Sequence, residues 1–214
     1  MRVTPIPRLR GDQVLERYAT RQLRRSSRMA AAFHGRKPII YFAGKIGRHD
    51  WRCELFGARI GGVDDDYGFR SLLDETHVRD MGPFAYGGPF FISCDHGCAH
   101  GPASHGAEPK GCLDGAAEGV LETHRAIWRV NRARIRRADL VFAYINETDC
   151  FGTLIELGYA AALNKPITIG IGRNIKIEEF DDLWMARECH TMGDVLLGSP
   201  NETFKRFMGD LGVY

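Results

Sequence analysis

The stretch from residue 138 to residue 172 constrains the fold of this chain more than any other. It contains two continuous apolar runs, "ADLVFAYIN" (138–146) and "KPITIGIG" (165–172), separated by a helical pattern over residues 152–163. Unbroken apolar runs are typical of parallel strands, which are buried on both faces of their sheet. A strand, a helix and a second strand in this order form a βαβ unit, so the sequence predicts a parallel sheet.

Two earlier apolar runs extend the predicted sheet. "KPIIYFAG" (37–44) and "YGGPFFISCD" (86–95) predict strands, and apolar residues at steps of three and four over 121–138 predict an amphipathic helix. The tail of the chain predicts a final helix with Ser199 or Asn201 as its N-cap. The sequence therefore predicts an α/β fold: a doubly wound, flavodoxin-like or Rossmann-like, mostly parallel sheet flanked by helices.

Charge is unevenly distributed along the chain. Residues 1–37 contain ten arginines or lysines but only two acids, Asp12 and Glu16, a balance of about +8. We expect these residues to form a basic N-terminal helical arm, followed by a single α/β domain over residues 38–214. The whole chain carries only +2, which argues against nucleic acid as a partner. No apolar run approaches the ~20 residues that span a bilayer, and the N-terminus lacks a secretory apolar core, so we expect a cytoplasmic protein without a membrane partner.

Candidate chemistry gathers at the predicted strand ends, where open α/β sheets bind their ligands. Three segments follow strands there: 44–52, 94–101 and 146–153. The last of them leads into a helix whose first turn is predicted to contain Glu156. A helix N-terminus favours an ionised carboxylate by ~0.3–1 kcal/mol. Such a group suits attack on an electron-poor carbon, for example an anomeric one. An acid that merely caps the helix is the alternative.

Three motifs together resemble a known enzyme family. "YFAG", "ADLVFAYIN" and, most specifically, "GTLIELGYAAALNKP" resemble the nucleoside 2-deoxyribosyltransferase family and its nucleotide N-glycosidase relatives. The resemblance implies an enzyme that cleaves or transfers the N-glycosidic bond of a nucleoside or nucleoside 5′-monophosphate and releases the base, with no cofactor required for the chemistry. It also implies that Glu156 is the nucleophile that attacks C1′, that Tyr41 orients Glu156 through its hydroxyl, and that the small residues Gly158 and Ala161 let the helix pack closely on the sheet.

Two positions depart from the family pattern. Cys150 stands six residues before Glu156, where family members usually have Asp or Ser. Asn131 stands where relatives usually place a second acid that contacts or protonates the base. An amide can hydrogen-bond a base but cannot supply a proton at neutral pH. The open alternatives are another acid such as His96, His100 or His124, departure of the base assisted in another way, and a nucleotide-binding sensor without turnover.

The loop after the first predicted strand has the composition of a phosphate cradle. Gly44, Lys45, Ile46, Arg48 and Arg52 combine backbone amides with cations, although a solvated surface loop is the alternative. The resemblance makes Arg48 the nearest match to a phosphate-binding arginine, so we favour a 5′-monophosphate substrate. The other expected substrate-binding residues are Asp149, Cys150, Gly152 and Thr153.

A loop rich in cysteine and histidine, within residues 94–112, predicts a structural zinc site. Its density of both residue types favours metal ligands or free thiols over a disulfide framework. Histidines that contact the base, or a lid without special chemistry, are the alternatives. The expected ligands are Cys94, His96, Cys98, His100 and Cys112.

The resemblance also bears on assembly and on a rival enzyme class. Family relatives imply a homodimer or higher homo-oligomer in which one subunit completes its neighbour's pocket. A partial apolar stripe at Val14, Leu15, Tyr18 and Leu23 favours assembly through the basic arm. The rival is a phosphoribohydrolase of the cytokinin-activating type, whose Gly-Gly-x-Gly-Thr-x-x-Glu motif is partly echoed by "FGTLIE". The missing glycine pair argues against it.

Overall fold

A six-stranded sheet forms the centre of the protein. The structure, a computed structural model, describes residues 33, 36–46, 51–57, 74–90, 120–176, 179, 183–192 and 195–212. The strands lie in the order β2-β3-β1-β4-β5-β6, and β2 and β3 are antiparallel while the other neighbours are parallel. Their bounds are β1 Ile39–Ala43, β2 Arg79–Asp80, β3 Ala85–Tyr86, β4 Leu140–Ile145, β5 Ile167–Ile171 and β6 Leu196–Leu197. The predicted α/β fold with a mostly parallel sheet is confirmed.

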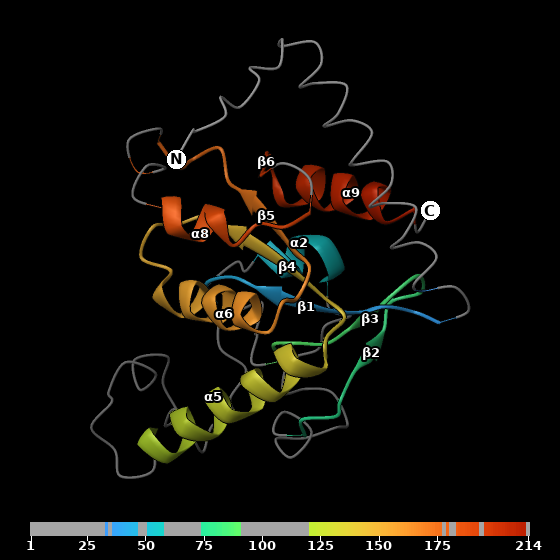
Figure 1. Cartoon of the computed structure of the whole chain (residues 1–214), viewed down its shortest axis with the longest axis vertical. Coiled ribbons are helices and arrows are strands. Elements are labelled where there is room, and N and C mark those ends of the chain that lie inside the picture. The colour runs from blue at the N-terminus through green and yellow to red at the C-terminus, as the bar shows by residue number, and fades with distance from the viewer. Residues whose placement is uncertain are drawn as a thin grey trace, which may run out of the picture.

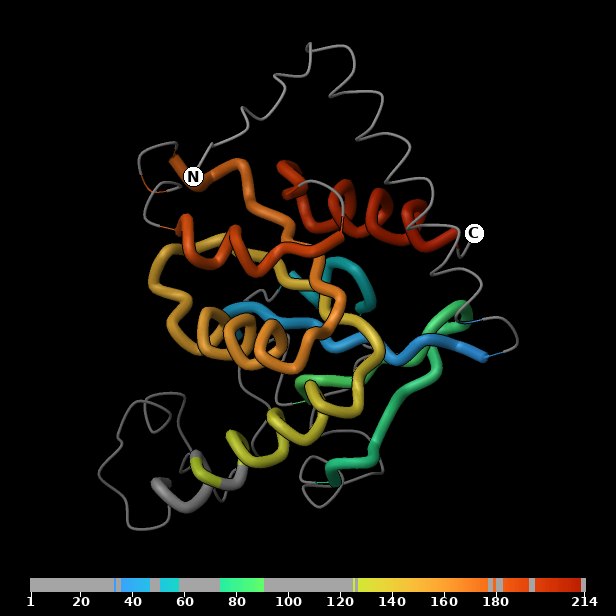
Figure 2. Tube along the Cα trace, in the orientation of Figure 1, coloured from blue at the N-terminus to red at the C-terminus, as the bar shows by residue number. Residues whose placement is uncertain are grey.

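Helices cover both faces of this sheet. Figure 1 shows α6 and α8 next to each other on one side of the strands and α9 on another, while α5 projects away from the sheet, as the tube in Figure 2 also shows. The helix bounds are α2 Trp51–Phe56, α5 Val120–Arg137, α6 Phe151–Ala162, α8 Trp184–Glu188 and α9 Pro200–Leu211. Part of the apolar core therefore lies on each side of the sheet.

The side chains of β1 point alternately into the two halves of the core. Ile40 and Phe42 belong to an aromatic cluster that includes residues of α2 and α9, whereas Tyr41 and Ala43 belong to an aliphatic cluster that includes residues of α6 and α8. Successive side chains of a strand point to opposite faces, so this division follows from the pleat. Phe42 is the centre of the first cluster, with its ring stacked on Tyr86 at a centroid distance of 5.0 Å.

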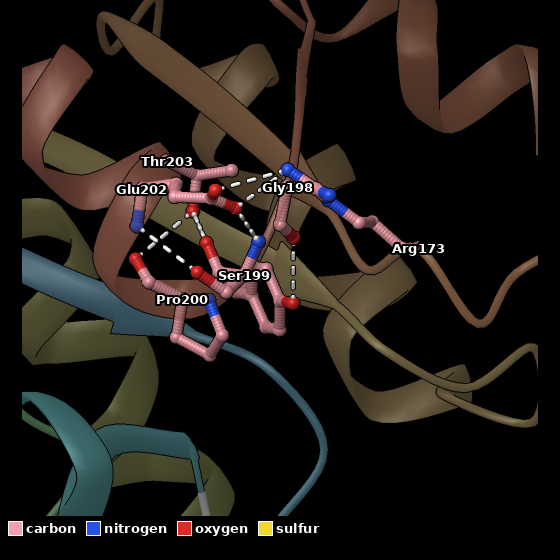
Figure 3. Close-up of polar contacts among 7 residues, drawn as sticks. Arg173, Gly198, Ser199, Pro200, Glu202 and Thr203 are labelled. Carbon is pink, nitrogen blue, oxygen red and sulfur yellow. Dashed lines mark hydrogen bonds and ion pairs between the residues drawn. The ribbon is translucent and has the colours of Figure 1, made fainter.

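Helix α9 begins with the predicted serine cap (Figure 3). The Ser199 hydroxyl accepts a hydrogen bond from the Glu202 amide at 3.3 Å, and the Glu202 carboxylate accepts one from the Ser199 amide at 2.8 Å. Arg173 pairs with the same carboxylate at 2.9 Å. This reciprocal capping box satisfies two backbone donors at the helix start. Of the two cap residues that the sequence left open, Ser199 and Asn201, the structure shows Ser199.

The sheet differs from the prediction at its edges. The second predicted strand (86–95) begins at Ala85 as β3, and regular strand ends at Tyr86. Its pairing with β1 nevertheless continues, because the Gly87 amide donates to the Ile40 carbonyl and the Phe42 amide donates to the Gly88 carbonyl, each at 2.8 Å. The two-residue strands β2 and β6 and the five-residue helix α8 were not predicted, since segments this short have no detectable period.

The end of the basic arm is attached to the domain. Arg36 donates two hydrogen bonds to the Asp139 carboxylate at 2.7 and 2.8 Å, and Lys37 pairs with Asp80. The remainder of the predicted helical arm, apart from Phe33, lies outside the described residues. Among the helices in the described part of the chain, none has the length and apolar character needed to cross a membrane.

Candidate active site

The strand order defines where a ligand would bind. From β1 the chain passes to β3 on one side, and it later returns to β4 on the other side of β1. The carboxyl ends of β1 and β4 therefore flank a topological switch point, the usual ligand crevice of open α/β sheets. Tyr41 lies on β1, and Glu156 lies on α6, the helix that follows β4.

Three elements meet at the carboxyl group of Glu156. The Tyr41 hydroxyl of β1 donates a hydrogen bond to Glu156 Oε1 at 2.6 Å, and Asn131 Nδ2 of α5 donates to the same oxygen at 3.3 Å. Within the described residues, the second oxygen, Oε2, accepts no hydrogen bond. Glu156 also keeps partial contact with solvent. One oxygen is thus held by two donors while the other is left for a ligand.

The protonation of Glu156 differs from the sequence expectation. Glu156 is the sixth residue of α6 and lies in its second turn, and α6 has no acid in its first turn. The helix N-terminus therefore does not set its charge. Burial raises the pKa of Glu156 to about 7, against the opposing effects of the Tyr41 hydrogen bond, the Arg52 charge and the Asn131 hydrogen bond. The sequence predicted an ionised carboxylate, and with this pKa the protonated and ionised forms are both populated at pH 7.

Tyr41 is suited to act as a permanent donor. Its side chain has no exposed surface. Burial, and then the neighbouring Glu156 charge and hydrogen bond, raise the pKa of Tyr41 well above its ordinary value. The hydroxyl therefore keeps its proton across the working range of pH and fixes the direction of the carboxylate.

Asn131 presents an acceptor beside the carboxylate. The residue is only 7% exposed, and its Oδ1 has no hydrogen-bond partner among the described residues. Because Nδ2 must face the acceptor Glu156, the amide oxygen is turned elsewhere. A buried acceptor without a partner is costly unless a ligand or water satisfies it. This site favours a ligand with an N–H or O–H donor at this position.

Arg52 is a feature of the site that the sequence prediction misplaced. Predicted as part of a surface phosphate loop, it is fully buried, and its guanidinium donates to the carbonyls of Phe42, at 3.0 and 2.8 Å, and Gly44, at 2.8 Å. It fixes the end of β1 and supplies a positive charge that lowers the pKa of Glu156. The available signal was its position inside the short apolar segment "WRCELF", whose aromatic residues Trp51 and Phe56 are buried with it.

Packing against Trp51 explains why a glycine, Gly44, follows β1. A Cβ on Gly44 would lie 2.5 Å from the Trp51 indole nitrogen, so a side chain is excluded there. The neighbouring Ile46 is partly buried against the aromatic cluster. These two members of the predicted phosphate loop are thus accounted for by packing, and Arg48 lies outside the described residues.

The residues around the start of α6 divide into buried and exposed groups. Cys150, the N-cap residue, is buried with a free thiol whose pKa is raised by burial. Thr153 is also buried, and its hydroxyl has no hydrogen-bond partner in the described part of the chain. Gly152 is exposed and has open space around its Cα. Asp149 is exposed and pairs with Lys45.

The close-packing role expected for Gly158 is wrong. Gly158 faces solvent, and a Cβ there would meet nothing within 4 Å. Ala160 is the fully buried small residue of α6. The expectation failed because the buried face of α6 contains Thr153, Leu157 and Ala160 instead.

The predicted zinc ligands Cys94, His96, Cys98, His100 and Cys112 lie outside the described residues, so the zinc site remains a prediction. Elsewhere in the chain, the residues that the structure describes contain no cluster of three metal-ligating side chains. Cys150 and Cys189 are free thiols, as expected. Cys53 of α2 is disulfide-bonded, so the expectation of free thiols or metal ligands is wrong for this residue.

Comparison with known proteins agrees with this geometry. A doubly wound sheet with a buried carboxylate at its switch point defines a class of α/β proteins that bind small ligands at the strand ends. Residues 95–183 match the family model of nucleoside 2-deoxyribosyltransferase, a range that includes β4, α6, Asn131 and Glu156. The match supports the resemblance to this family that the sequence motifs predict, over this part of the chain. Neither the curated proteins nor the solved structures gave a match.

Proposed function

We propose that this protein cleaves or transfers the N-glycosidic bond of a nucleoside or nucleoside 5′-monophosphate, with Glu156 as the nucleophile. The observation that carries the proposal is the carboxyl group of Glu156, held at Oε1 by Tyr41 and Asn131 and left without a hydrogen bond at Oε2 from the described residues. A family whose model describes nucleoside 2-deoxyribosyltransferase supports the same chemistry. The reaction needs no cofactor, since the carboxylate supplies the electron pair.

The first step forms a glycosyl ester. Oε2 of ionised Glu156 attacks C1′ of the sugar, the new C1′–O bond forms, and the C1′–N bond breaks with its electron pair passing to the base nitrogen. The departing base takes up a proton. Asn131 cannot donate that proton, because an amide does not ionise at neutral pH. Its free Oδ1 instead accepts a hydrogen bond from the substrate, and a different group or solvent protonates the base.

The second step releases the sugar. The oxygen of a water molecule attacks C1′ and gives up one proton to solvent, the ester C1′–O bond breaks with its electron pair passing to Glu156, and the carboxylate is restored with a free sugar as product. When a nitrogen of a second base attacks instead, the product is a new nucleoside. Throughout, Tyr41 keeps its proton and orients the carboxyl group.

A substrate panel tests the proposal. Purified protein is incubated with ribo- and deoxyribonucleosides and their 5′-monophosphates, with and without a second free base, and released or exchanged base is measured by chromatography. We expect release from at least one member, and a glycosyl adduct on the peptide containing Glu156 after rapid quenching. Tight binding with no release from any member would overturn the enzymatic proposal and favour a nucleotide-binding sensor, the interpretation that Asn131 and Cys150 support.

Removing the Tyr41 hydroxyl is expected to weaken the nucleophile without removing it. A Tyr41→Phe variant loses a 2.6 Å hydrogen bond to a charged group, which is worth roughly 1.5–3 kcal/mol. We expect kcat/KM at pH 7 to fall about tenfold to a hundredfold, with the apparent pKa of the activity profile shifted upward. The matched control is Tyr144→Phe, whose hydroxyl donates to the Gly198 carbonyl on the other face of the sheet. A lower rate with an unshifted pH profile would contradict this positioning role.

We further propose that the outer face of α6 pairs with a second copy of the chain, so that the neighbour helps to close the pocket. Phe151 and Ile155, one turn apart, are 72% and 57% exposed, and Trp128 of α5 is also exposed and lies against Tyr159. A two-fold interface brings the same patch of two subunits together, and an apolar patch is self-complementary. Phe151 directly follows Cys150, so the paired faces would lie at the crevice.

Introducing a charge on this face is expected to dissociate the oligomer. An Ile155→Lys variant should elute as a monomer in size-exclusion chromatography with light scattering at concentrations where the natural protein is a dimer or larger. Leu197→Lys on β6 is the matched control, because Leu197 is 62% exposed but lies on a different element. A monomeric natural protein, or an Ile155→Lys variant that keeps the same mass, would contradict the proposal.

A further inference from the structure

Helix α5 has a high concentration of positive charge. Its residues Val120–Arg137 include six arginines and one acid, Glu122, a net charge of +5. Four exposed arginines follow one another along one face of the helix, at steps of four, three and four residues: Arg125, Arg129, Arg132 and Arg136. Since each residue of a helix adds ~1.5 Å along its axis, this arginine stripe extends over about 16 Å.

Acidic side chains compensate little of this charge in the described part of the chain. Arg129 pairs with Glu75 at 3.9 Å, and the Arg129 side chain is 71% exposed. Among the described residues, no acid pairs with Arg125, Arg132 or Arg136. Like charges three and four residues apart repel one another on a helix surface, so an anionic partner would stabilise this face of α5.

Two aromatic rings lie beside the arginine stripe. Trp128 is 38% exposed, and its ring meets that of Tyr159 of α6 at a centroid distance of 6.3 Å. The Arg132 guanidinium lies over both rings, 5.6 Å from the centre of Trp128 and 5.8 Å from that of Tyr159. Arg136 donates a hydrogen bond to the Tyr159 hydroxyl at 2.9 Å. These contacts hold two of the cations next to aromatic faces.

The opposite face of α5 packs on the core. Val130 and Ile135 have no exposed surface, and Asn131 contacts Glu156. A helix that lies on a membrane inserts a free apolar face, whereas Trp128 is the one large apolar side chain of α5 that is exposed among those the structure describes. Figure 1 shows that α5 projects away from the sheet, which makes its exposed stripe accessible to an extended partner. These features favour a macromolecule in solution over a lipid surface.

We propose that the arginine stripe of α5 binds a single strand of nucleic acid, with phosphates on the arginines and a base stacked on Trp128. A row of cations matches a partner whose negative charges repeat along a chain, and an aromatic ring beside them matches its unpaired bases. An acidic protein offers the first of these features without the second. The proposal is independent of the glycosidic chemistry. It revises the sequence expectation, which argued against nucleic acid from the net charge of +2 of the whole chain.

The arginine stripe borders the face of α6 that is proposed to pair with a second copy, because Trp128 contacts Tyr159. The charged side chains of the stripe are not part of that apolar face. Different variants therefore test the two proposals: a charge introduced at Ile155 tests assembly, and loss of charge on α5 tests binding of nucleic acid.

Binding of a labelled oligonucleotide at several salt concentrations tests the inference. The full-length protein is titrated into a fluorescein-labelled oligothymidylate of about 20 nucleotides, and fluorescence anisotropy gives the association constant. We expect a dissociation constant of roughly 10 μM or less at low salt. The logarithm of the association constant should fall with the logarithm of the salt concentration with a slope of about −3 or steeper, because each phosphate neutralised on a single strand contributes ~0.7.

Two kinds of substitution separate the arginines from the aromatic ring. Arg125→Gln with Arg132→Gln should make the slope shallower by about 1.4, since two cations are lost. Trp128→Ala should weaken binding roughly tenfold and leave the slope unchanged, because stacking on a base releases no ions, whereas Trp128→Tyr should keep most of the affinity. The matched control is Lys205→Gln with Arg206→Gln, which removes two exposed cations from α9 and should change neither quantity.

Several results would overturn the inference. One is the absence of binding at low salt, and another is an equal change of slope in the α9 control, which would indicate charge without a defined site. An effect of Trp128→Ala as large for poly-glutamate as for the oligonucleotide would favour an acidic protein instead. Tighter binding to vesicles of phosphatidylserine and phosphatidylcholine than to the oligonucleotide would favour a membrane.

The mass of the variants separates binding from assembly. In size-exclusion chromatography with light scattering, the α5 variants should keep the mass of the natural protein. A change of mass in Arg125→Gln with Arg132→Gln would assign the arginine stripe to contact between subunits and would overturn its assignment to nucleic acid.

Discussion

A Glu156→Gln variant is expected to lose base release by at least about a thousandfold, because the amide cannot form the glycosyl ester that starts the reaction. Glutamine keeps the shape of the side chain and an oxygen that can accept the Tyr41 hydrogen bond, so the loss would report chemistry rather than misfolding. Release of the base under single-turnover conditions is the measurement, with saturating protein over the best substrate of the panel.

Two comparisons make this result interpretable. Glu188→Gln removes an exposed acid from α8 and should release base at the natural rate. Circular dichroism of both variants should match that of the natural protein, and their thermal melting should match it at pH 4.5, where Glu156 is protonated in the folded protein and about half protonated in the unfolded chain. Full base-releasing activity in Glu156→Gln, with any substrate, would contradict the proposal that Glu156 is the nucleophile.

The second large effect is a dependence on pH that follows from the burial of Glu156. Only the ionised carboxylate attacks, and its pKa is raised to about 7. We therefore expect kcat/KM to increase about tenfold per pH unit below this value and to level off above pH 8. An activity profile already flat from pH 5 upward would show that the carboxyl group ionises as an ordinary exposed acid.

The same shift predicts how stability changes with pH. In the unfolded chain Glu156 ionises near 4.5, whereas in the folded protein it holds its proton up to about 7. Between these values the unfolded state binds fewer protons, so the free energy of unfolding falls as pH rises, by at most about 3 kcal/mol from this group. Glu156→Gln removes this loss of stability, because a glutamine side chain does not ionise.

Urea denaturation at two pH values measures this effect. At each pH the free energy of unfolding of the natural protein is subtracted from that of Glu156→Gln. This difference should be larger at pH 8.5 than at pH 4.5 by about 3 kcal/mol. The Glu188→Gln control should show no such change. A Glu156→Gln variant with the same relative stability at both pH values would contradict the raised pKa of Glu156.

The centre of the fold could be predicted from the sequence, whereas its edges could not. Strands β1, β4 and β5 are buried on both faces and therefore appear in the sequence as continuous apolar runs. Strands β2 and β6 have two residues each, and their pairing depends on distant partners rather than on local pattern. The final helix was predicted, with its cap narrowed to Ser199 or Asn201, because helix caps depend on neighbouring residues in the sequence.

The site shows a similar division. The contact between Tyr41 and Glu156 was expected from the resemblance to the family, and the structure contains it. Its electrostatics could not be predicted in this way, because the pKa of Glu156 depends on burial and on the opposing effects of Tyr41, Arg52 and Asn131, which come from three different elements. Lys45 and Arg52 looked alike in the sequence as two cations of one loop. One is engaged by acids across the crevice and the other by backbone carbonyls in the interior, and a sequence does not contain those distances.

The alternation of Tyr41 and Phe42 on β1 has a consequence for how this protein can evolve. The strand contributes one side chain to the hydrogen bond with Glu156 and the next to the aromatic cluster on the opposite face. Substitutions in that cluster can therefore accumulate without touching the reacting carboxylate. A single-residue insertion or deletion within β1 would exchange the two roles at once, placing the Tyr41 hydroxyl among aromatic rings and the Phe42 ring against Glu156. We therefore expect β1 to tolerate substitutions on either one of its faces better than it tolerates an insertion or a deletion.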